Sequence, residues 1–321
     1  MKIFPLTLLP NDANINFMKM RWVSIVIAAI IMFVAIGAMV TRNFNFALDF
    51  TGGNLVEVHL EKPANLDEVR NRLAADGYDS AQVQTYGAGN ELLIRLQPRE
   101  GDSTAAATSH AAESVMKAVS VGGNTGKVLR NEFVGPQVGK ELALNGLYAL
   151  IFVIVGFLIY IAFRFEWKFA VAAIITTLHD VIVVAGWFAI SGHEFDLTVL
   201  AGILSVMGYS INDTIVVFDR VRENFRSMRA DPETVLNKSI NQTLSRTVIT
   251  SFVAFLTVIA LYIYGGGSLR GMAESQMLGI VIGTLSSIFV ACPLLTLGLL
   301  KVTKQDLLPK AKDDAALARR P

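Results

Sequence analysis

Six apolar segments, each about as long as a helix that crosses a bilayer, dominate this sequence and limit the folds open to it. They lie at 22–41, 143–163, 169–190, 197–218, 247–264 and 278–300. A helix needs about 20 residues to cross about 30 Å of hydrocarbon. Apolar residues make up 53% of the chain and charged residues 17%, which is unusual for a soluble domain. The sequence therefore predicts a mainly α membrane protein built on a bundle of six transmembrane helices.

The first apolar segment could also be read as a cleaved signal peptide, because Lys19 and Arg21 precede it. Its apolar core is longer than the roughly 7 to 15 residues usual in a signal peptide, and it lacks a convincing cleavage site of small residues. We therefore expect an N-terminal segment 1–21 followed by a retained helix 22–41.

Positive charges beside the apolar segments predict their orientation, because Lys and Arg concentrate in cytoplasmic loops. They precede the first segment, separate the second from the third and the fourth from the fifth, and follow the sixth. The turns at 191–196 and 265–277 carry only Arg270. We therefore expect both termini, including the basic tail 301–321, in the cytoplasm. Residues 42–142 are then outside, and 143–300 hold the remaining five helices.

The outer segment 42–142 has the pattern of an α+β domain. Period-two alternation predicts strands at 54–61, 80–86, 91–97 and 127–134, and helical periodicity predicts helices at 65–76 and 108–119, with a loop at 97–108. The order β-α-β-β-α-β is that of a ferredoxin-like domain. The only cysteine, Cys292, lies in the sixth apolar segment, so no intrachain disulfide can stabilise this domain.

The sequence lacks common signatures of catalysis: it has no H-E-x-x-H, no Walker-type glycine loop and no G-x-S-x-G elbow. His193 and Glu194 lie in a short outer turn with no second histidine at ligand spacing, so we expect solvated side chains and no metal site. A net charge of +1 gives no basic surface for nucleic acid. We therefore expect neither an enzyme nor a nucleic-acid-binding protein.

Ionisable residues within the apolar segments mark the candidate site, because charge is costly in hydrocarbon. Asp213 belongs to a stripe, expected to face protein or water, that also contains Gly202, Ser205, Tyr209 and Asn212. It precedes Arg220 by seven residues, which places it roughly 10 Å inside the cytoplasmic end of its helix. A carboxylate at that depth either takes up a proton or finds a cation. Asp213 is therefore a candidate proton relay; the alternatives are a hydrogen bond between helices or a water-filled vestibule.

Two further ionisable residues are candidates. Arg246 is predicted to open the fifth helix, on a face with Thr243, Thr250 and Thr257, and this polar stripe favours an inward-facing partner of Asp213 over a flanking charge. Asp180 follows His179 near the middle of the third helix. It could line an ion path or serve as a structural partner of another helix.

Four motifs occur in order along the chain. They are Ala47-Leu48-Asp49-Phe50-Thr51-Gly52-Gly53, then Phe163-Arg164-Phe165-Glu166, then residues 208–214 (GYSINDT) followed by Phe218-Asp219-Arg220, and finally Gln242-Thr243-Leu244-Ser245-Arg246-Thr247. With these motifs, essentially the whole chain resembles the SecF branch of the SecD/SecF family, which is related to RND-type (resistance, nodulation, division) transporters.

The resemblance implies a subunit of the bacterial preprotein translocase without ATPase or hydrolase chemistry of its own. With SecD, it would use the proton motive force to draw unfolded polypeptides out of the SecYEG channel late in export, with YajC as a further partner. Protons would be the coupling ion and no cofactor is implied. The membrane would be the bacterial inner membrane, with residues 42–142 in the periplasm.

The resemblance also assigns roles to single residues. Asp213 and Arg246 fall on the proton-path residues of the family, and we add Asp180 and Asn212 to this candidate path. Asp49, Phe50, Thr51, Gly52 and Gly53 fall on a hinge-like segment between the first helix and the outer domain, where glycines permit backbone angles closed to other residues.

Six helices with one outer insert correspond to half of a two-repeat transporter body, so a second chain must supply the other half. SecD would be that chain. Two alternatives remain: a half-size exporter of lipids or small hydrophobic molecules that dimerises with itself, and a scaffold for the export channel that transports nothing.

Overall fold

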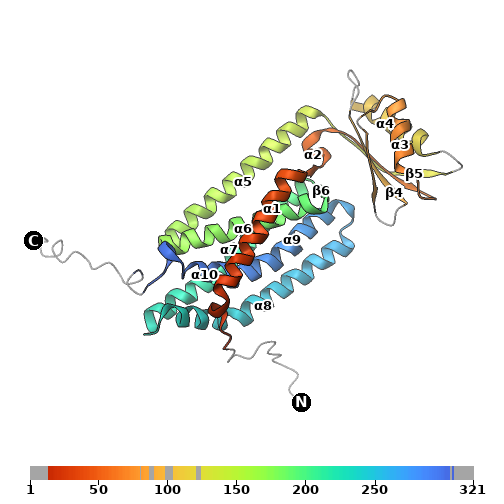
Figure 1. Ribbon diagram of the computed structural model, residues 1–321. Helices are drawn as coiled ribbons and strands as arrows, with labels where there is room; N and C mark the ends of the chain where they lie inside the picture. The colour runs from red at the N-terminus through yellow and green to blue at the C-terminus, as the bar shows by residue number, and fades with distance from the viewer. Residues whose placement is uncertain are drawn as a thin grey trace, which may run out of the picture. The chain divides into compact units, whose positions relative to one another are not determined.

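The computed structural model describes residues 14–79, 81–86, 90–97, 104–120, 124–303 and 306. The chain divides into two compact units (Figure 1). Residues Phe46–Ala149 form an α+β unit, and the chain on either side of them forms a helical unit.

In the described part of the chain, six helices are long and apolar enough to span a membrane, as the hydropathy pattern predicts. A 3₁₀ helix, Phe17–Met20, precedes α1 (Arg21–Arg42). The next four helices are α5 (Pro136–Arg164), α6 (Trp167–Ser191), α7 (Leu197–Ser227) and α8 (Pro232–Tyr264). The sixth span consists of α9 (Gly267–Ser286), a π-helical turn at Ser287–Ala291 and α10 (Cys292–Leu294); a 3₁₀ turn, Gly298–Leu300, follows. The first turns of α5 belong to the α+β unit.

Four helices extend by seven or more residues beyond the predicted apolar segments, and α5 does so by beginning at Pro136 instead of 143. α7 continues past residue 218 to Ser227, α8 begins at Pro232 instead of 247, and α9 begins at Gly267 instead of 278. Polar residues form helix as readily as apolar ones, so a hydropathy window detects only the part of a helix that suits hydrocarbon. The predicted outer turn 265–277 is correspondingly reduced to two residues, Gly265 and Gly266.

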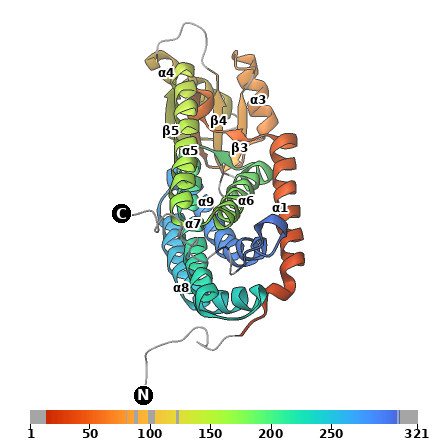
Figure 2. The ribbon, with the colours of Figure 1, turned by 90° about the vertical axis from the view of Figure 1, so that its left-hand side faces the viewer.

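The loop between α7 and α8 lies at the same end of the bundle as the 3₁₀ helix before α1 (Figure 2). There the backbone N–H of Met18 donates to Asn237 Oδ1 of α8 at 2.9 Å. Asp231 caps the start of α8 by accepting from the backbone N–H of Thr234 at 3.0 Å. This capping bond explains why α8 can begin well before its apolar part.

The central helices of the bundle are α6, α7 and the sixth span. About half of each of their apolar windows is buried, at 56%, 50% and 56%, against 11% in α1 and α5. Small residues allow the close approach: a Cβ on Gly279 of α9 would lie 2.0 Å from Val206 Cγ2 of α7. The outer helices α1, α5 and α8 consequently present apolar side chains to lipid or to another chain.

The α+β unit confirms the ferredoxin-like prediction. Its strands, β2 (Gly53–Leu60), β3 (Gln82–Tyr86), β4 (Glu91–Leu96) and β5 (Gly126–Val134), form an antiparallel sheet in the order β3-β4-β2-β5. Side chains of this sheet and of α3 (Leu66–Ala75) and α4 (Thr104–Val119) form one core. Three short elements lie outside it: β1 (Asn45–Phe46), α2 (Leu48–Thr51) and β6 (Glu194–Phe195).

α4 begins at Thr104, within the predicted loop 97–108, and residues 98–103 of that loop lie outside the described part of the chain. In β2, the side chains of Val56, Val58 and Leu60 are fully buried. They alternate with Glu57 and His59, so period-two patterning located this strand correctly.

Candidate functional site

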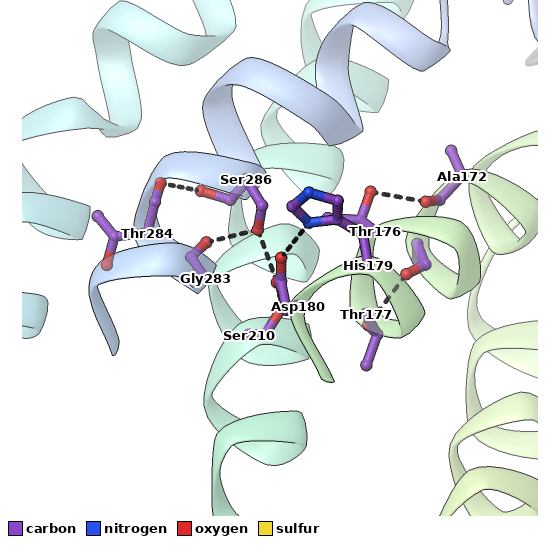
Figure 3. Close-up of polar contacts among 11 residues, drawn as sticks. Ala172, Thr176, Thr177, His179, Asp180, Ser210, Gly283, Thr284 and Ser286 are labelled. Atoms are coloured by element: carbon purple, nitrogen blue, oxygen red, sulfur yellow. Dashed lines mark hydrogen bonds and ion pairs between the residues drawn. The ribbon is translucent and has the colours of Figure 1, made fainter. Parts of the chain in front are cut away.

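Asp180 lies at the point where α6, α7 and α9 meet, and it is completely buried. Its Oδ2 accepts hydrogen bonds from Ser210 Oγ of α7 at 2.5 Å and from Ser286 Oγ of α9 at 2.6 Å. Its Oδ1 lies 2.9 Å from His179 Nδ1. Figure 3 shows the two serines and the histidine converging on this carboxylate. Both oxygens therefore have partners.

His179 gives this cluster a second titratable group. Its Nδ1 faces the Asp180 carboxylate, whereas its Nε2 is buried and has no hydrogen-bond partner. The histidine and the two serines therefore meet at one carboxylate, and the serines join α6 to α7 and α9.

Asp213 is buried on α7 at 3% exposure, and its environment differs from that of Asp180. Its Oδ2 is buried without a hydrogen-bond partner, and within the described chain it makes no ion pair. α7 continues 14 residues beyond Asp213 to Ser227. Asp213 therefore lies about 21 Å from the helix end, instead of the roughly 10 Å predicted from Arg220. The buried Asp213 side chain therefore either carries a proton or needs a cation that this chain does not place in contact with it.

The prediction that Arg246 opens a helix is wrong. Arg246 lies well inside α8, 14 residues after Pro232. Its side chain is exposed in this single chain, and no ion pair joins it to Asp213 within the described residues. On the same stripe, Thr243 is buried whereas Thr250 and Thr257 are exposed. The stripe predicted to face the interior is therefore mostly on the surface of this chain.

The polar stripe of α7 also divides between two faces. Gly202 and Asp213 are buried, whereas Ser205 and Asn212 are exposed, so Asn212 does not join Asp213 inside the bundle. Together with Arg246 on α8, these exposed polar residues lie on membrane-length helices. Polar side chains on such helices avoid lipid where they can.

Hydroxyl groups make a second connection between helices that the sequence did not reveal. The Tyr209 hydroxyl donates to Ser251 Oγ of α8 at 2.6 Å, and Ser251 Oγ lies 2.7 Å from Thr284 Oγ1 of α9. Serine and threonine in an apolar helix often bond only to their own backbone, so composition cannot identify those that join helices. Ser210 and Ser286 escaped prediction for the same reason.

The predicted hinge segment is a one-turn helix, α2, followed by two glycines. Gly52 has φ 68° and ψ 172°, and Gly53, the first residue of β2, has φ 120°. Both values lie in regions that other residues rarely adopt. A Cβ on Gly53 would also lie 2.7 Å from the carbonyl oxygen of Leu96 in β4. The two glycines therefore form the tight start of β2.

His193 is not simply solvated, because its Nδ1 lies 2.7 Å from Glu274 Oε1 of α9. The same carboxylate oxygen accepts a hydrogen bond from Trp187 Nε1 at 2.8 Å. Among the described residues, no cluster of three or more His, Cys, Asp or Glu could hold a metal ion.

Comparisons with known families agree with this architecture. Residues 114–300 match the family described as protein export membrane protein SecD/SecF, C-terminal, and residues 37–64 match the SecD/SecF GG motif. The second match contains Gly52 and Gly53.

Individual relatives extend the similarity over nearly the whole chain. The protein translocase subunit SecF of Vibrio alginolyticus is 43% identical over 305 residues, which cover 94% of this chain and 95% of that protein. The protein translocase subunit SecDF of Brucella abortus is 38% identical, and its match covers 90% of this chain but 38% of that longer protein. The crystal structure of SecDF, a translocon-associated membrane protein from Thermus thermophilus, matches with a TM-score of 0.80 and 34% identity, over 90% of this chain and 39% of that one.

Proposed function

The chain belongs to the SecD/SecF family of protein-export membrane proteins, and we propose that it couples proton movement through its helices to polypeptide export. It is a multi-pass membrane protein and a subunit of the Sec-pathway protein translocase. The observation that carries the proposed coupling is the contrast between two buried carboxylates: Asp180 is fully hydrogen-bonded, whereas Asp213 is unpaired.

The partner that completes the site is SecD. In the SecDF relatives, this chain corresponds to about two-fifths of a longer polypeptide, at 38% and 39% of its length. The exposed polar residues Asn212 of α7 and Arg246 of α8 form the surface that we assign to SecD. Contact with a second bundle would remove them from lipid and enclose Arg246 near Asp213.

In this proposal Asp213 takes up and releases the proton, and Arg246, Asn212 and Asp180 lie along its path without all carrying it. Proton uptake by Asp213 removes its attraction to Arg246, which changes the packing of α7 against α8 and the partner. Asp180 can transmit such a change because its hydrogen bonds join α6 to α7 and α9. The segment 49–53 would pass the movement from α1 to the α+β unit, acting as a hinge as well as the start of β2.

We place the chain in the bacterial inner membrane with both termini in the cytoplasm and the α+β unit in the periplasm. There it would act with SecYEG, and with YajC as a further partner, on unfolded polypeptides that emerge late in export. The proton is the only coupling ion required, and no cofactor or hydrolytic chemistry of its own is involved.

The test is late-stage precursor release from inverted membrane vesicles, with and without a proton gradient. Asp213→Asn keeps the size and hydrogen-bonding ability of the side chain but cannot exchange a proton. We expect it to abolish the stimulation by the gradient while membrane insertion and association with SecD persist. Asp231→Asn, the same chemical change at an exposed helix cap, is the matched control and should retain the stimulation.

Full gradient-dependent release by Asp213→Asn would contradict the relay and favour the scaffold alternative. The exporter alternative has no supporting observation, because the relatives compared are translocase subunits. It predicts that deletion sensitises cells to small hydrophobic compounds, whereas loss of a translocase subunit slows secretion and causes precursors to accumulate.

A further inference from the structure

A charged pocket of about 520 Å³ lies beside the end of α5 and the last two turns of α7. It is lined by Arg164, Asp219, Arg222, Glu223, Arg226 and Ser227. The α7 residues recur at helical spacing and share one face, opposite Arg164. The pocket brings together two of the sequence motifs, residues 163–166 and 218–220, that the proton path does not use.

The pocket has more free donors than acceptors. Its two carboxylates are already engaged: Asp219 accepts from Arg164 at 2.6 Å, and Glu223 accepts from Arg220 at 2.8 Å. Arg226 makes no ion pair with any residue in the described ranges. The Nε of Arg222 is buried without an acceptor. Glu166 also has a buried oxygen, Oε2, without a partner, but this residue does not line the pocket. An anion is therefore the ligand that the pocket suits.

Packing holds the arginines in place. The guanidinium groups of Arg164 and Arg222 lie 5.2 and 5.3 Å from the ring centre of Phe165, which is buried. Arg222 also donates to the carbonyl oxygen of Arg164 at 3.3 Å and pairs with Glu166 at 3.0 Å. Because these contacts fix Arg164 and Arg222, these two side chains are arranged before a ligand binds, which lowers the entropy lost on binding.

The surroundings of the pocket indicate that the ligand also has an apolar part. Phe163, next to Arg164, is 90% exposed, and Tyr160 and Trp167 are also exposed. Exposed aromatic rings at the end of a membrane-length helix are typical of the boundary between headgroups and hydrocarbon. From this boundary, the exposed apolar side chains Ile151, Phe152, Val155 and Ile159 continue along α5.

We propose that this pocket binds the phosphate of an anionic phospholipid, whose acyl chains lie along the exposed apolar face of α5. Arginine suits this role because its planar fork of donors matches the oxygens of a phosphate. Basic pockets between transmembrane helices are known to bind acidic headgroups. Free phosphate shares the charge but cannot use the aromatic and apolar surface of α5.

The experiment uses the purified full chain in detergent, with bound lipid counted by native mass spectrometry. Phosphatidylglycerol and phosphatidylcholine of identical acyl chains are titrated in parallel, and inorganic phosphate is added as a competitor. We expect phosphatidylglycerol to bind more tightly than phosphatidylcholine and to resist displacement by inorganic phosphate. Arg226→Gln should weaken the binding of phosphatidylglycerol about five-fold, the loss of roughly one arginine–headgroup interaction.

Arg229→Gln is the matched control, because Arg229 is exposed in the loop after α7, carries the same charge and does not line the pocket. It should leave the affinity unchanged. Equal binding of the two lipids, or equal losses in both variants, would overturn the proposal in favour of general surface charge. Full displacement of phosphatidylglycerol by inorganic phosphate would contradict the proposal that the ligand is a lipid. An unchanged affinity in Arg226→Gln would exclude this pocket.

Discussion

The Asp180 side chain receives its two hydroxyl donors from other helices, beside His179 of its own helix. Ser210 and Ser286 donate to the same oxygen from α7 and α9. A hydrogen bond to a charged group contributes about 1.5 to 3 kcal/mol to stability, and more is lost when a buried charge is left without its donor. These hydroxyl groups are therefore expected to stabilise the three-helix contact as well as to serve the proposed proton path.

Ser286→Ala tests this contribution because the neighbouring serine is a close control. We expect Ser286→Ala to lower the free energy of unfolding by about 1 to 3 kcal/mol, since it removes a donor from Asp180. Ser287→Ala removes an equally buried hydroxyl that donates only within its own helix, to the Thr284 carbonyl at 2.9 Å, and should have a smaller effect. Thermal unfolding in detergent measures both, and equal losses would contradict the role of Asp180.

Gly53 is the residue whose backbone the fold restricts most clearly. Gly53→Ala should destabilise the α+β unit by about 1 to 3 kcal/mol, because φ is 120° and the new Cβ would meet the Leu96 carbonyl oxygen. Gly135→Ala is the control, since a Cβ there has no neighbour within 4 Å. Protease resistance in membranes should fall for Gly53→Ala alone; equal resistance in the two variants would contradict this role.

The proposed hinge requires a different result from Gly52→Ala, because any variant that contains Gly53→Ala already disturbs the start of β2. If backbone freedom at Gly52 serves movement, export should slow although abundance and protease resistance are retained. Loss of abundance together with export would leave only the structural role at the start of β2. Normal abundance with normal export would exclude both roles.

Among the secondary-structure elements, α8 depends on the cap at its start. Hydrogen bonds from the hydroxyl and backbone N–H of Thr234 lower the pKa of Asp231 below its usual value. The folded state thus binds this proton less readily than the unfolded state, so the cap stabilises the fold above the unfolded pKa of about 3.9. That stability is lost as the pH falls through the lower folded pKa.

Asp231→Asn keeps the capping hydrogen bonds but removes the titrating carboxyl group. Asparagine accepts the same capping bonds but carries no proton to exchange in this range. We expect the melting temperature of the native chain to fall more steeply between pH 5 and pH 3, about where Asp titrates, than that of Asp231→Asn. Parallel decreases in the two proteins would show that other carboxylates dominate acid unfolding.

For the whole molecule, the alternation of charged loops predicts how the chain crosses the membrane. Reporter fusions in the α7–α8 loop and at the C-terminus should read cytoplasmic, and fusions near Gly101 periplasmic. Ala230 is the position for the first of these fusions, because it lies in the loop after α7 ends at Ser227. Gly101 lies outside the described residues. A cytoplasmic reading there would overturn the orientation.

The number and order of the main elements followed from the sequence by itself. Hydropathy over about 20 residues and periodicity within single segments are local properties, and they predicted the six membrane helices and the β-α-β-β-α-β unit. The same locality explains the errors. The polar start of α8 lies outside any apolar window, so Arg246 was placed at the start of a helix when it lies well inside one.

The surroundings of each ionisable side chain were decided only by the tertiary structure. Asp180 obtains its donors from residues 30 and 106 positions further along the chain, and no local pattern relates them. Asp213 and Arg246 each lie on a polar stripe of their own helix, and these stripes predict an inward-facing pair. In the structure, Asp213 is buried without a partner and Arg246 is exposed. A helical period shows which residues share a face, but what that face contacts depends on how α6, α7, α8 and α9 pack together.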